Sequence, residues 1–299
     1  MKKVLVIAGP TASGKSDFAV QAAKMLDGEI ISGDSIQVYR GMNIGSGKIQ
    51  EEEMQGIPHH LIDILDIKQP YSVSDFQTMA RNLIETIDMP IIAGGTGLYL
   101  KACLYDYSFI KEEKPEAEET YDGISNESLY ERLQELDPAS AEKIHPNNRQ
   151  RLVRALNIIT FTGMTKSDIE AAQKHEPVYD FYIAGCTMER DVLYDRINRR
   201  VERMFEEGLE EEVRGLIAKG YTFADPGMKG IGYREFEPYL QGNASIEEVK
   251  AEIQKHSRNY AKRQYTWLNH QMPVHWFGAD DPSERENMLE AIQRWRNTV

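Results

Sequence analysis

Short apolar runs and amphipathic stretches alternate along the first hundred residues. Four apolar runs, each bounded by Gly, Pro or polar residues, predict buried parallel strands at 3–8, 29–32, 60–64 and 90–93. Amphipathic spacing predicts helices at 17–26 and 73–87, the second with Ser72 or Ser74 as its N-cap. Strands that alternate with helices predict an α/β fold, a doubly wound parallel sheet that binds ligands at the C-terminal ends of its strands.

The pattern changes after residue 110. Residues 111–176 are acidic and helix-rich, with turn signals at Asp137-Pro138 and His145-Pro146, and no strand-like alternation. The chain then returns to a strand at 181–187, helices at 190–207, 209–219 and 246–269, a strand at 274–277 and a last helix. We therefore expect a P-loop-type core at 1–110 and 178–299, interrupted by a small all-helical insertion domain at 111–177.

The composition narrows the class of protein. The chain has 299 residues, of which 41% are hydrophobic and 28% charged, as in a globular protein with a sizeable core. Its two cysteines, Cys103 and Cys186, are far apart, which argues against a disulfide framework or a zinc site and fits a reducing compartment. Because no run of 18 apolar residues occurs, we expect a cytoplasmic protein with no membrane partner.

The net charge of −13 argues, taken alone, against a nucleic-acid partner. The charge is unevenly distributed, however. Residues 112–142 are strongly acidic, whereas three stretches are locally basic: 149–154, 190–203 and 255–263. A bipolar protein can bind RNA on one face, so the total charge does not exclude it.

Residues 9–16, GPTASGKS, match the phosphate-binding P-loop pattern G-x-x-x-x-G-K-[ST] between a predicted strand and a predicted helix. The glycines let backbone N–H groups surround an anion at a helix N-terminus. Lys15 would supply a mobile cation, and the Ser16 hydroxyl a ligand for a magnesium ion that bridges two phosphates. The motif predicts binding of a di- or triphosphate, and read alone it indicates a nucleotide such as ATP.

Polar residues follow two other predicted strands. Asp34 begins the segment DSIQVYR directly after the strand at 29–32, beside the P-loop in this fold. Its carboxylate could hold magnesium or accept a proton from a nucleophile, or simply cap a turn. Gly94-Gly95-Thr96 follows the strand at 90–93 and allows a close approach, although such a signal alone is often an ordinary tight turn.

Two later segments carry candidate chemistry. Arg234 follows Gly230-Ile231-Gly232-Tyr233 and is either a second clamp on a diphosphate or a surface arginine. Residues 258–267, RNYAKRQYTW, interleave basic and aromatic side chains on a predicted helix, which suits unpaired RNA but also an ordinary solvated helix face. The histidines show no metal-binding spacing, and we expect them to be structural.

Together these segments resemble the tRNA dimethylallyltransferase (tRNA isopentenyltransferase) family over nearly the whole chain. The resemblance is carried by the P-loop, Asp34-Ser35 with 37–42, 94–96, His145-Pro146-Asn147 with Arg151 and 154–156, and 261–264. It implies an enzyme that transfers a dimethylallyl group from dimethylallyl diphosphate to N6 of the adenosine at tRNA position 37, next to the anticodon, and releases diphosphate.

The resemblance also implies roles for residues. The diphosphate would lie in the P-loop, on Gly9, Pro10, Thr11, Ala12, Ser13, Gly14, Lys15 and Ser16, with Mg²⁺ as the cofactor and Ser16 as its ligand. Asp34 would be the general base, and Thr11 and Arg234 would complete the catalytic clamp. The tRNA would contact Asp34, Ser35, Ile36, Gln37, Thr96, Arg149, Gln150, Arg151, Arg258, Lys262 and Arg263.

The same resemblance implies that the helical insertion grips the anticodon stem-loop and that the target base leaves its stack. We expect the protein to act as a monomer. The chain departs from the family at Gly45-Ser46-Gly47, where threonine and alanine are common, and it lacks the cysteines of the C-terminal zinc finger of eukaryotic relatives, which fits a bacterial form.

Two other functions explain part of the sequence. A P-loop small-molecule or nucleotide kinase would use Asp34 as base and a cluster of arginines: Arg196, Arg199 and Arg203. It leaves the basic and aromatic helix at 258–267 without a role. An RNA-binding P-loop NTPase is the second alternative, although no N-K-x-D segment is present to read guanine.

Overall fold

The computed structural model describes residues 1–109 and 121–298. The chain forms two compact units, a core unit made of Met1–Tyr105 with Pro177–Val299 and an insertion unit, Asp106–Glu176. The boundary expected from the sequence between residues 110 and 111 lies outside the described residues. Each unit has its own hydrophobic core.

The core unit is built on a six-stranded sheet in the order β3-β2-β4-β1-β5-β6. All of its pairings are parallel. The strands are β1 (Lys3–Ala8), β2 (Glu29–Ser32), β3 (His59–His60), β4 (Pro90–Gly94), β5 (Asp180–Thr187) and β6 (Val274–Gly278). This arrangement confirms the predicted α/β fold with a parallel sheet. Because β1 lies between two partners, the loop that follows it leaves from the middle of the sheet.

The strand predicted at 60–64 is wrong beyond its first residue. Only His59 and His60 pair with β2. The backbone then adopts positive φ angles of 62° at Leu61 and 54° at Asp63, which an extended strand does not allow. The Asp63 carboxylate instead forms an ion pair with the buried Lys48 ammonium group, with Nζ and Oδ1 2.5 Å apart. This contact holds the segment as a loop.

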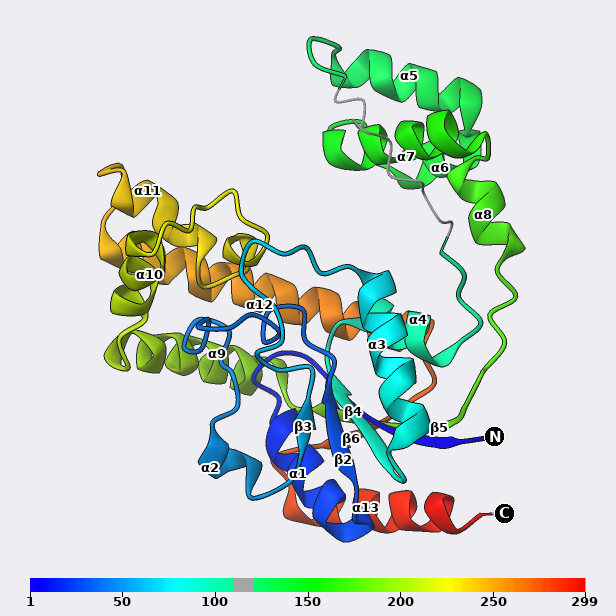
Figure 1. Cartoon of the computed structure of the whole chain (residues 1–299), viewed down its shortest axis with the longest axis vertical. Helices are drawn as coiled ribbons and strands as arrows, with labels where there is room; N and C mark the ends of the chain where they lie inside the picture. The colour runs from blue at the N-terminus through cyan, green and yellow to red at the C-terminus, as the bar shows by residue number, and fades with distance from the viewer. Residues whose placement is uncertain (110–120, 299) are drawn as a thin grey trace. The chain divides into compact units, whose positions relative to one another are not determined.

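Helices cover both faces of the sheet, because alternate residues of each buried strand point to opposite sides. Val4 and Val6 of β1 pack with α3 (Val73–Thr86) and α4 (Gly97–Leu104), whereas Leu5 and Ile7 pack with α1 (Lys15–Leu26) and α13 (Pro282–Asn297). Figure 1 shows these helices on either side of the strands. Ser72 is the N-cap of α3 and forms a capping box with Asp75.

A second cluster of helices packs beside the sheet within the core unit. It contains α9 (Arg190–Glu206), α10 (Leu209–Ala218), the long α12 (Ile246–Gln271) and the short helices η1 (Gly227–Lys229), η2 (Arg234–Phe236) and α11 (Glu237–Leu240). The fully buried Tyr233 and Phe236 lie in its core. The four-residue α2 (Glu51–Met54) has no buried residue and is not part of this cluster. Of the helices in the described residues, none is long and apolar enough to cross a membrane.

The described part of the insertion unit is helical, with α5 (Asn126–Leu136), α6 (Pro138–Lys143), α7 (Arg149–Thr162) and α8 (Lys166–Ala172). Ser, Asp, Asn and Thr side chains cap the four helices, namely Ser125, Asp137, Asn148 and Thr165. Leucines of α5 and α7 form its core. Of the acidic residues described between 121 and 142, most are exposed on the outside of this small bundle, whereas Asp137 is buried at the start of α6.

Candidate active site

The P-loop leaves β1 at Gly9 and enters α1 at Lys15. Gly9 has a φ of +144°, and a Cβ there would lie 2.6 Å from the carbonyl oxygen of Cys186 on β5. Gly14, with a φ of +84°, is the N-cap of α1. These two glycines allow the loop to curl against the helix N-terminus, where free N–H groups favour an anion.

Two side chains of the loop are suited to bind an anion. Ser13 is fully buried, and its Oγ has no hydrogen-bond partner in the described structure. Lys15 donates from Nζ to the Pro10 carbonyl oxygen at 2.5 Å. Burial lowers the pKa of Lys15 to about 8, while the charge of Asp34 acts in the opposite direction. An unpaired buried hydroxyl and a desolvated ammonium group are both stabilised when a phosphate binds.

A pocket of about 940 Å³ opens at this loop. Seven of the residues that the sequence analysis predicted for the site line it: Thr11, Ala12, Gly14, Lys15, Ser16, Asp34 and Gln37. Several other predicted residues are not part of its lining, namely Gly9, Pro10, Ser13, Ser35, Ile36, Thr96 and Arg234, although Gly94 and Gly95 are. The C-terminal ends of β1, β2 and β4 thus meet at one concave site, as expected for this sheet.

The Asp34 carboxylate is held in place by its own loop. Its Oδ1 accepts hydrogen bonds from the backbone N–H groups of Ile36, at 2.8 Å, and Gln37, at 3.2 Å. In the described structure its Oδ2 makes no hydrogen bond. Asp34 can therefore cap the turn and also take part in the chemistry, because Oδ1 orients the side chain and Oδ2 is available to a ligand or a proton.

Arg200 of α9 is a site residue that the sequence analysis missed. Its Nη1 donates to Thr11 Oγ1 at 3.1 Å and its Nη2 to the Gly47 carbonyl oxygen at 3.2 Å. Burial lowers the pKa of its guanidinium, and the charge of Asp34 raises it. The basic stretch at 190–203 contained the signal, because Arg196, Arg200 and Arg203 are spaced to share one helix face.

Gln264 of α12 is a second residue that was missed as a site group. Its Oε1 accepts a hydrogen bond from the Thr11 backbone N–H at 2.9 Å, and the side chain is buried. A Cβ at Gly95 would collide with this amide, so the glycine makes room for it. One turn earlier, Tyr260 Oη lies 3.4 Å from Thr96 Oγ1. Helix α12 therefore packs directly on the P-loop and on the turn after β4.

Arg234 lies elsewhere in the core unit. Its side chain is half exposed, and its Nε donates to Glu235 Oε1 at 3.0 Å. The nearly fully buried Glu235 also binds His256 Nδ1 at 2.7 Å. The clamp role expected for Arg234 stays a prediction, while Arg200 is the arginine that contacts the P-loop.

The basic residues of α12 differ in their surroundings. Arg258 donates from Nη1 to Asn198 Oδ1 of α9 and so joins the two helices. Lys262 and Arg263 are exposed, and the Arg263 guanidinium lies 5.7 Å from the centre of the Tyr260 ring. An exposed cation beside an aromatic face is a suitable contact for RNA.

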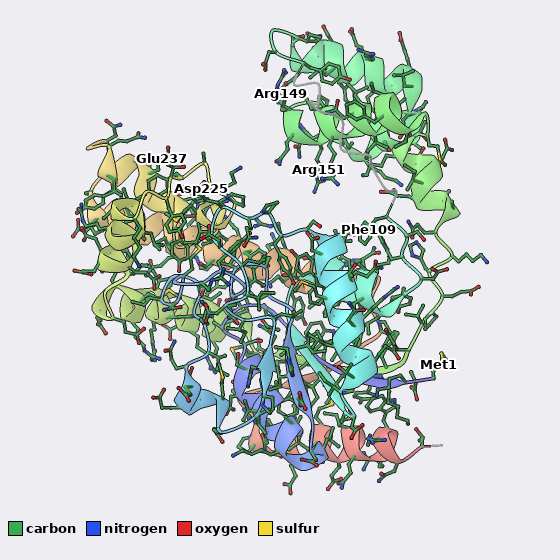
Figure 2. The ribbon with its side chains drawn as sticks, in the orientation of Figure 1. Met1, Phe109, Arg149, Arg151, Asp225 and Glu237 are labelled. Atoms are coloured by element: carbon green, nitrogen blue, oxygen red, sulfur yellow. The ribbon has the colours of Figure 1, made fainter. Side chains whose placement is uncertain are left out.

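In the insertion unit, Arg149 and Arg151 lie near the start of α7 (Figure 2). The Arg149 guanidinium donates to the carbonyl oxygens of Tyr121, at 2.6 Å, and Ile124, at 2.7 Å. It therefore ties the segment before α5 to α7. Gln150 and Arg151 are exposed at the same helix end.

The donor set fits magnesium carried by a diphosphate. Among the described residues, no group of three or more His, Cys, Asp or Glu side chains gathers to hold a metal. Mg²⁺ keeps several waters and binds proteins through one or two side-chain oxygens together with substrate phosphates. The Ser16 hydroxyl and the Asp34 carboxylate, which line the same pocket, meet that requirement.

Comparison with known proteins identifies the family of the chain. The family model of the IPP transferases matches residues 37–271. The tRNA dimethylallyltransferase of Macrococcus caseolyticus is 47% identical over 298 residues, which cover 97% of this chain and 94% of the relative. That of Anoxybacillus flavithermus is 45% identical over 296 residues, covering 97% and 95%.

Solved structures give the same result. The crystal structure of a tRNA delta(2)-isopentenylpyrophosphate transferase from Staphylococcus epidermidis aligns with a TM-score of 0.74 at 41% identity and covers 99% of both chains. A eukaryotic dimethylallyltransferase acting on tRNA aligns with a TM-score of 0.83 at 30% identity, covering 98% of this chain and 77% of that one. The chain therefore belongs to the tRNA dimethylallyltransferase (IPP transferase) family.

Proposed function

We propose that this protein transfers the dimethylallyl group of dimethylallyl diphosphate to N6 of the adenosine at position 37 of tRNA. The observation that carries the proposal is the meeting of the P-loop, Arg200 and Asp34 in one pocket. Two kinds of group are needed for this reaction, cations that stabilise a departing diphosphate and a base that takes a proton from a weak nucleophile. The pocket contains both kinds.

The P-loop supplies the anion site. The N–H groups at the start of α1, the Ser13 hydroxyl and the Lys15 ammonium group would contact the diphosphate, with Arg200 beside Thr11 as the second cation. Because Arg200 contacts Thr11 and Arg234 pairs with Glu235, we assign to Arg200 the clamp function that the sequence suggested for Arg234. Charge that develops on the leaving group is stabilised most by groups that are already in place.

Asp34 supplies the base. An exocyclic amine conjugated to a purine is a poor nucleophile, so the proton must leave as the new bond forms. The N6 nitrogen attacks C1 of the dimethylallyl group, the N–C bond forms, the C–O bond to the diphosphate breaks, and the N6 proton passes to the Asp34 carboxylate. The Oδ1 contacts with Ile36 and Gln37 hold the carboxylate during this step.

Ser16 would hold the magnesium ion that accompanies the diphosphate, which would add positive charge next to the leaving group. The side chains of Lys15 and Arg200 also place positive charge next to the leaving group.

The RNA would bind at the open side of the same pocket. The exposed Lys262 and Arg263 of α12 provide phosphate contacts, and the insertion unit offers Gln150 and Arg151 for the anticodon stem-loop. The base must leave its stack to reach Asp34. Arg149 would act mainly by holding the insertion unit together, because its guanidinium is engaged by two carbonyl groups.

A direct assay separates this function from its rivals. The protein is incubated with labelled dimethylallyl diphosphate, ATP or GTP, with and without unmodified tRNA, and with tRNA in which guanosine replaces adenosine 37. We expect prenyl label in the RNA only when adenosine 37 is present. Phosphoryl transfer, or tRNA-stimulated nucleotide hydrolysis without prenylation, would refute the proposal in favour of a kinase or an NTPase.

A further inference from the structure

The loop of residues 43–47, called the pocket loop below, is held by a carboxylate from another part of the chain. Glu212 of α10 accepts backbone hydrogen bonds at Oε2 from Asn43 and Ile44, both at 2.9 Å, and at Oε1 from Gly45 at 3.2 Å. Three successive N–H groups thus surround one carboxylate, in the manner of an anion nest.

Tyr233 extends this arrangement by one residue. Its hydroxyl donates to Glu212 Oε1 at 2.7 Å and accepts from the Ser46 backbone N–H at 3.2 Å. The ring is fully buried and lies so close to Gly45 that a Cβ there would be 2.6 Å from Cζ. Burial and the Glu212 charge raise the pKa of Tyr233, so the phenol keeps the proton that it donates. Four consecutive backbone N–H groups of the pocket loop are therefore fixed by two side chains.

The far end of the pocket loop is in the site. The Gly47 carbonyl oxygen accepts from Arg200 Nη2 and from Gln37 Nε2, each at 3.2 Å. Gly47 has a φ of +56°, and a Cβ there would overlap the Arg200 guanidinium. This carbonyl group is therefore one of the two acceptors that hold the guanidinium, the other being Thr11 Oγ1.

We propose that Glu212, together with Tyr233, is a positioning device that sets the Arg200 guanidinium against Thr11 through the pocket loop. Neither residue touches the P-loop, so each acts through Gly47 and Arg200. The proposal rests on the proposed function in one respect, the role of Arg200 on the leaving diphosphate. The proposal also explains why the Glu212 carboxylate lines a pocket that binds an anion. Its negative charge is stabilised by hydrogen bonds from backbone N–H groups and from the Tyr233 phenol.

The test is a double-mutant cycle with Glu212→Gln and Arg200→Lys. A glutamine keeps the size of Glu212 but offers one acceptor oxygen in place of two, so the loop loses part of its support. We expect Glu212→Gln to lower kcat/KM for dimethylallyl transfer about tenfold and to weaken binding of inorganic diphosphate with Mg²⁺ by a similar factor, measured by calorimetry. The double variant should be no slower than Arg200→Lys alone, because the two residues act on one interaction.

Two results would overturn the proposal. The first is a Glu212→Gln enzyme whose kcat/KM and diphosphate affinity are unchanged. The second is a double variant in which the two losses of kcat/KM multiply, because that indicates a general structural effect. Glu210→Gln is the matched control, since Glu210 lies on the same helix and binds the exposed Arg214 and Tyr239. Should Glu212→Gln fail to fold by circular dichroism, Tyr233→Phe makes the same test with the carboxylate in place.

Separate measurements test the transfer reaction and the role of Glu212. A wild-type protein that transfers no prenyl group refutes the proposed function, whereas the diphosphate-binding cycle still measures whether Glu212 acts through Arg200.

Discussion

The pocket has two walls that place positive charge by different means. The P-loop wall relies on backbone geometry, with positive φ angles at Gly9 and Gly14 and the N-terminus of α1. The other wall relies on side chains, because Arg200 donates to the Gly47 carbonyl group at the end of a loop whose N–H groups bind Glu212 of α10. The first wall is specified by eight consecutive residues, and the second by contacts between segments far apart in sequence. Substitutions far from the pocket should therefore disturb the side-chain wall more readily than the P-loop wall.

The largest effect is expected for the base that lies between the walls. Asp34→Asn retains an acceptor for the Ile36 and Gln37 N–H groups but removes the proton acceptor. We expect kcat for prenyl transfer to fall by about 10²–10⁴-fold, with diphosphate binding preserved. Single-turnover kinetics and calorimetry measure the two quantities. Loss of magnesium-dependent diphosphate binding would instead assign Asp34 to the metal.

The Arg200→Gln substitution tests the side-chain wall. The substitution removes the charge beside Thr11, and we expect kcat to fall by about 10²–10³-fold, the range for loss of one group that stabilises developing negative charge. Arg294→Gln is the charge control, because Arg294 is exposed on α13 and pairs with Glu290. An Arg200→Gln enzyme with normal kcat, alongside a strongly impaired Arg234→Gln enzyme, would return the clamp to Arg234.

The P-loop wall is probed by Gln264→Met, which removes the acceptor for the Thr11 N–H but nearly keeps the volume of the side chain. We expect KM for dimethylallyl diphosphate to rise about tenfold, the cost of one unsatisfied backbone group, with a smaller change in kcat. Gln271→Met, on the exposed end of the same helix, is the control. An equal change in both variants would show that α12 does not support the P-loop.

The smallest effect concerns pH. Burial lowers the pKa of Lys15 to about 8, so its ammonium group is charged below pH 8 and loses its proton as the pH rises through that value. Affinity for inorganic diphosphate should therefore fall by up to about tenfold between pH 7 and pH 9, relative to a Lys15→Arg variant, which stays charged. Calorimetry in paired buffers should also detect proton uptake on binding above pH 8. Parallel pH profiles of the two proteins would contradict this prediction.

The parts of the molecule that follow from local sequence were predicted well. Lys3–Ala8 and Glu29–Ser32 are strands at the predicted residues, and the P-loop and Asp34 meet where parallel strands end. These features depend on periodicity and on short motifs. The segment at 61–64 was wrong because a tertiary contact, Lys48 with Asp63, holds an apolar run as a loop.

The side-chain wall could not be predicted in the same way. Arg200 is one of several arginines in a basic helix, and only the packing of α9 against the pocket loop distinguishes it from Arg199, whose guanidinium pairs with Asp195. Glu212 similarly resembles the neighbouring acidic residues of α10 until the fold brings the N–H groups of the pocket loop to it. The fold therefore determines which of several similar residues takes part in the site.

We propose that both walls hold a leaving group whose phosphates are released and never transferred. The most direct test uses dimethylallyl diphosphate labelled with ¹⁴C in the prenyl group and ³²P in the diphosphate, incubated with unmodified tRNA. We expect ¹⁴C in the RNA, an equal amount of free ³²P-diphosphate, and the loss of both in Arg200→Gln. Incorporation of ³²P into RNA, or release of single phosphate without prenylation, would contradict it.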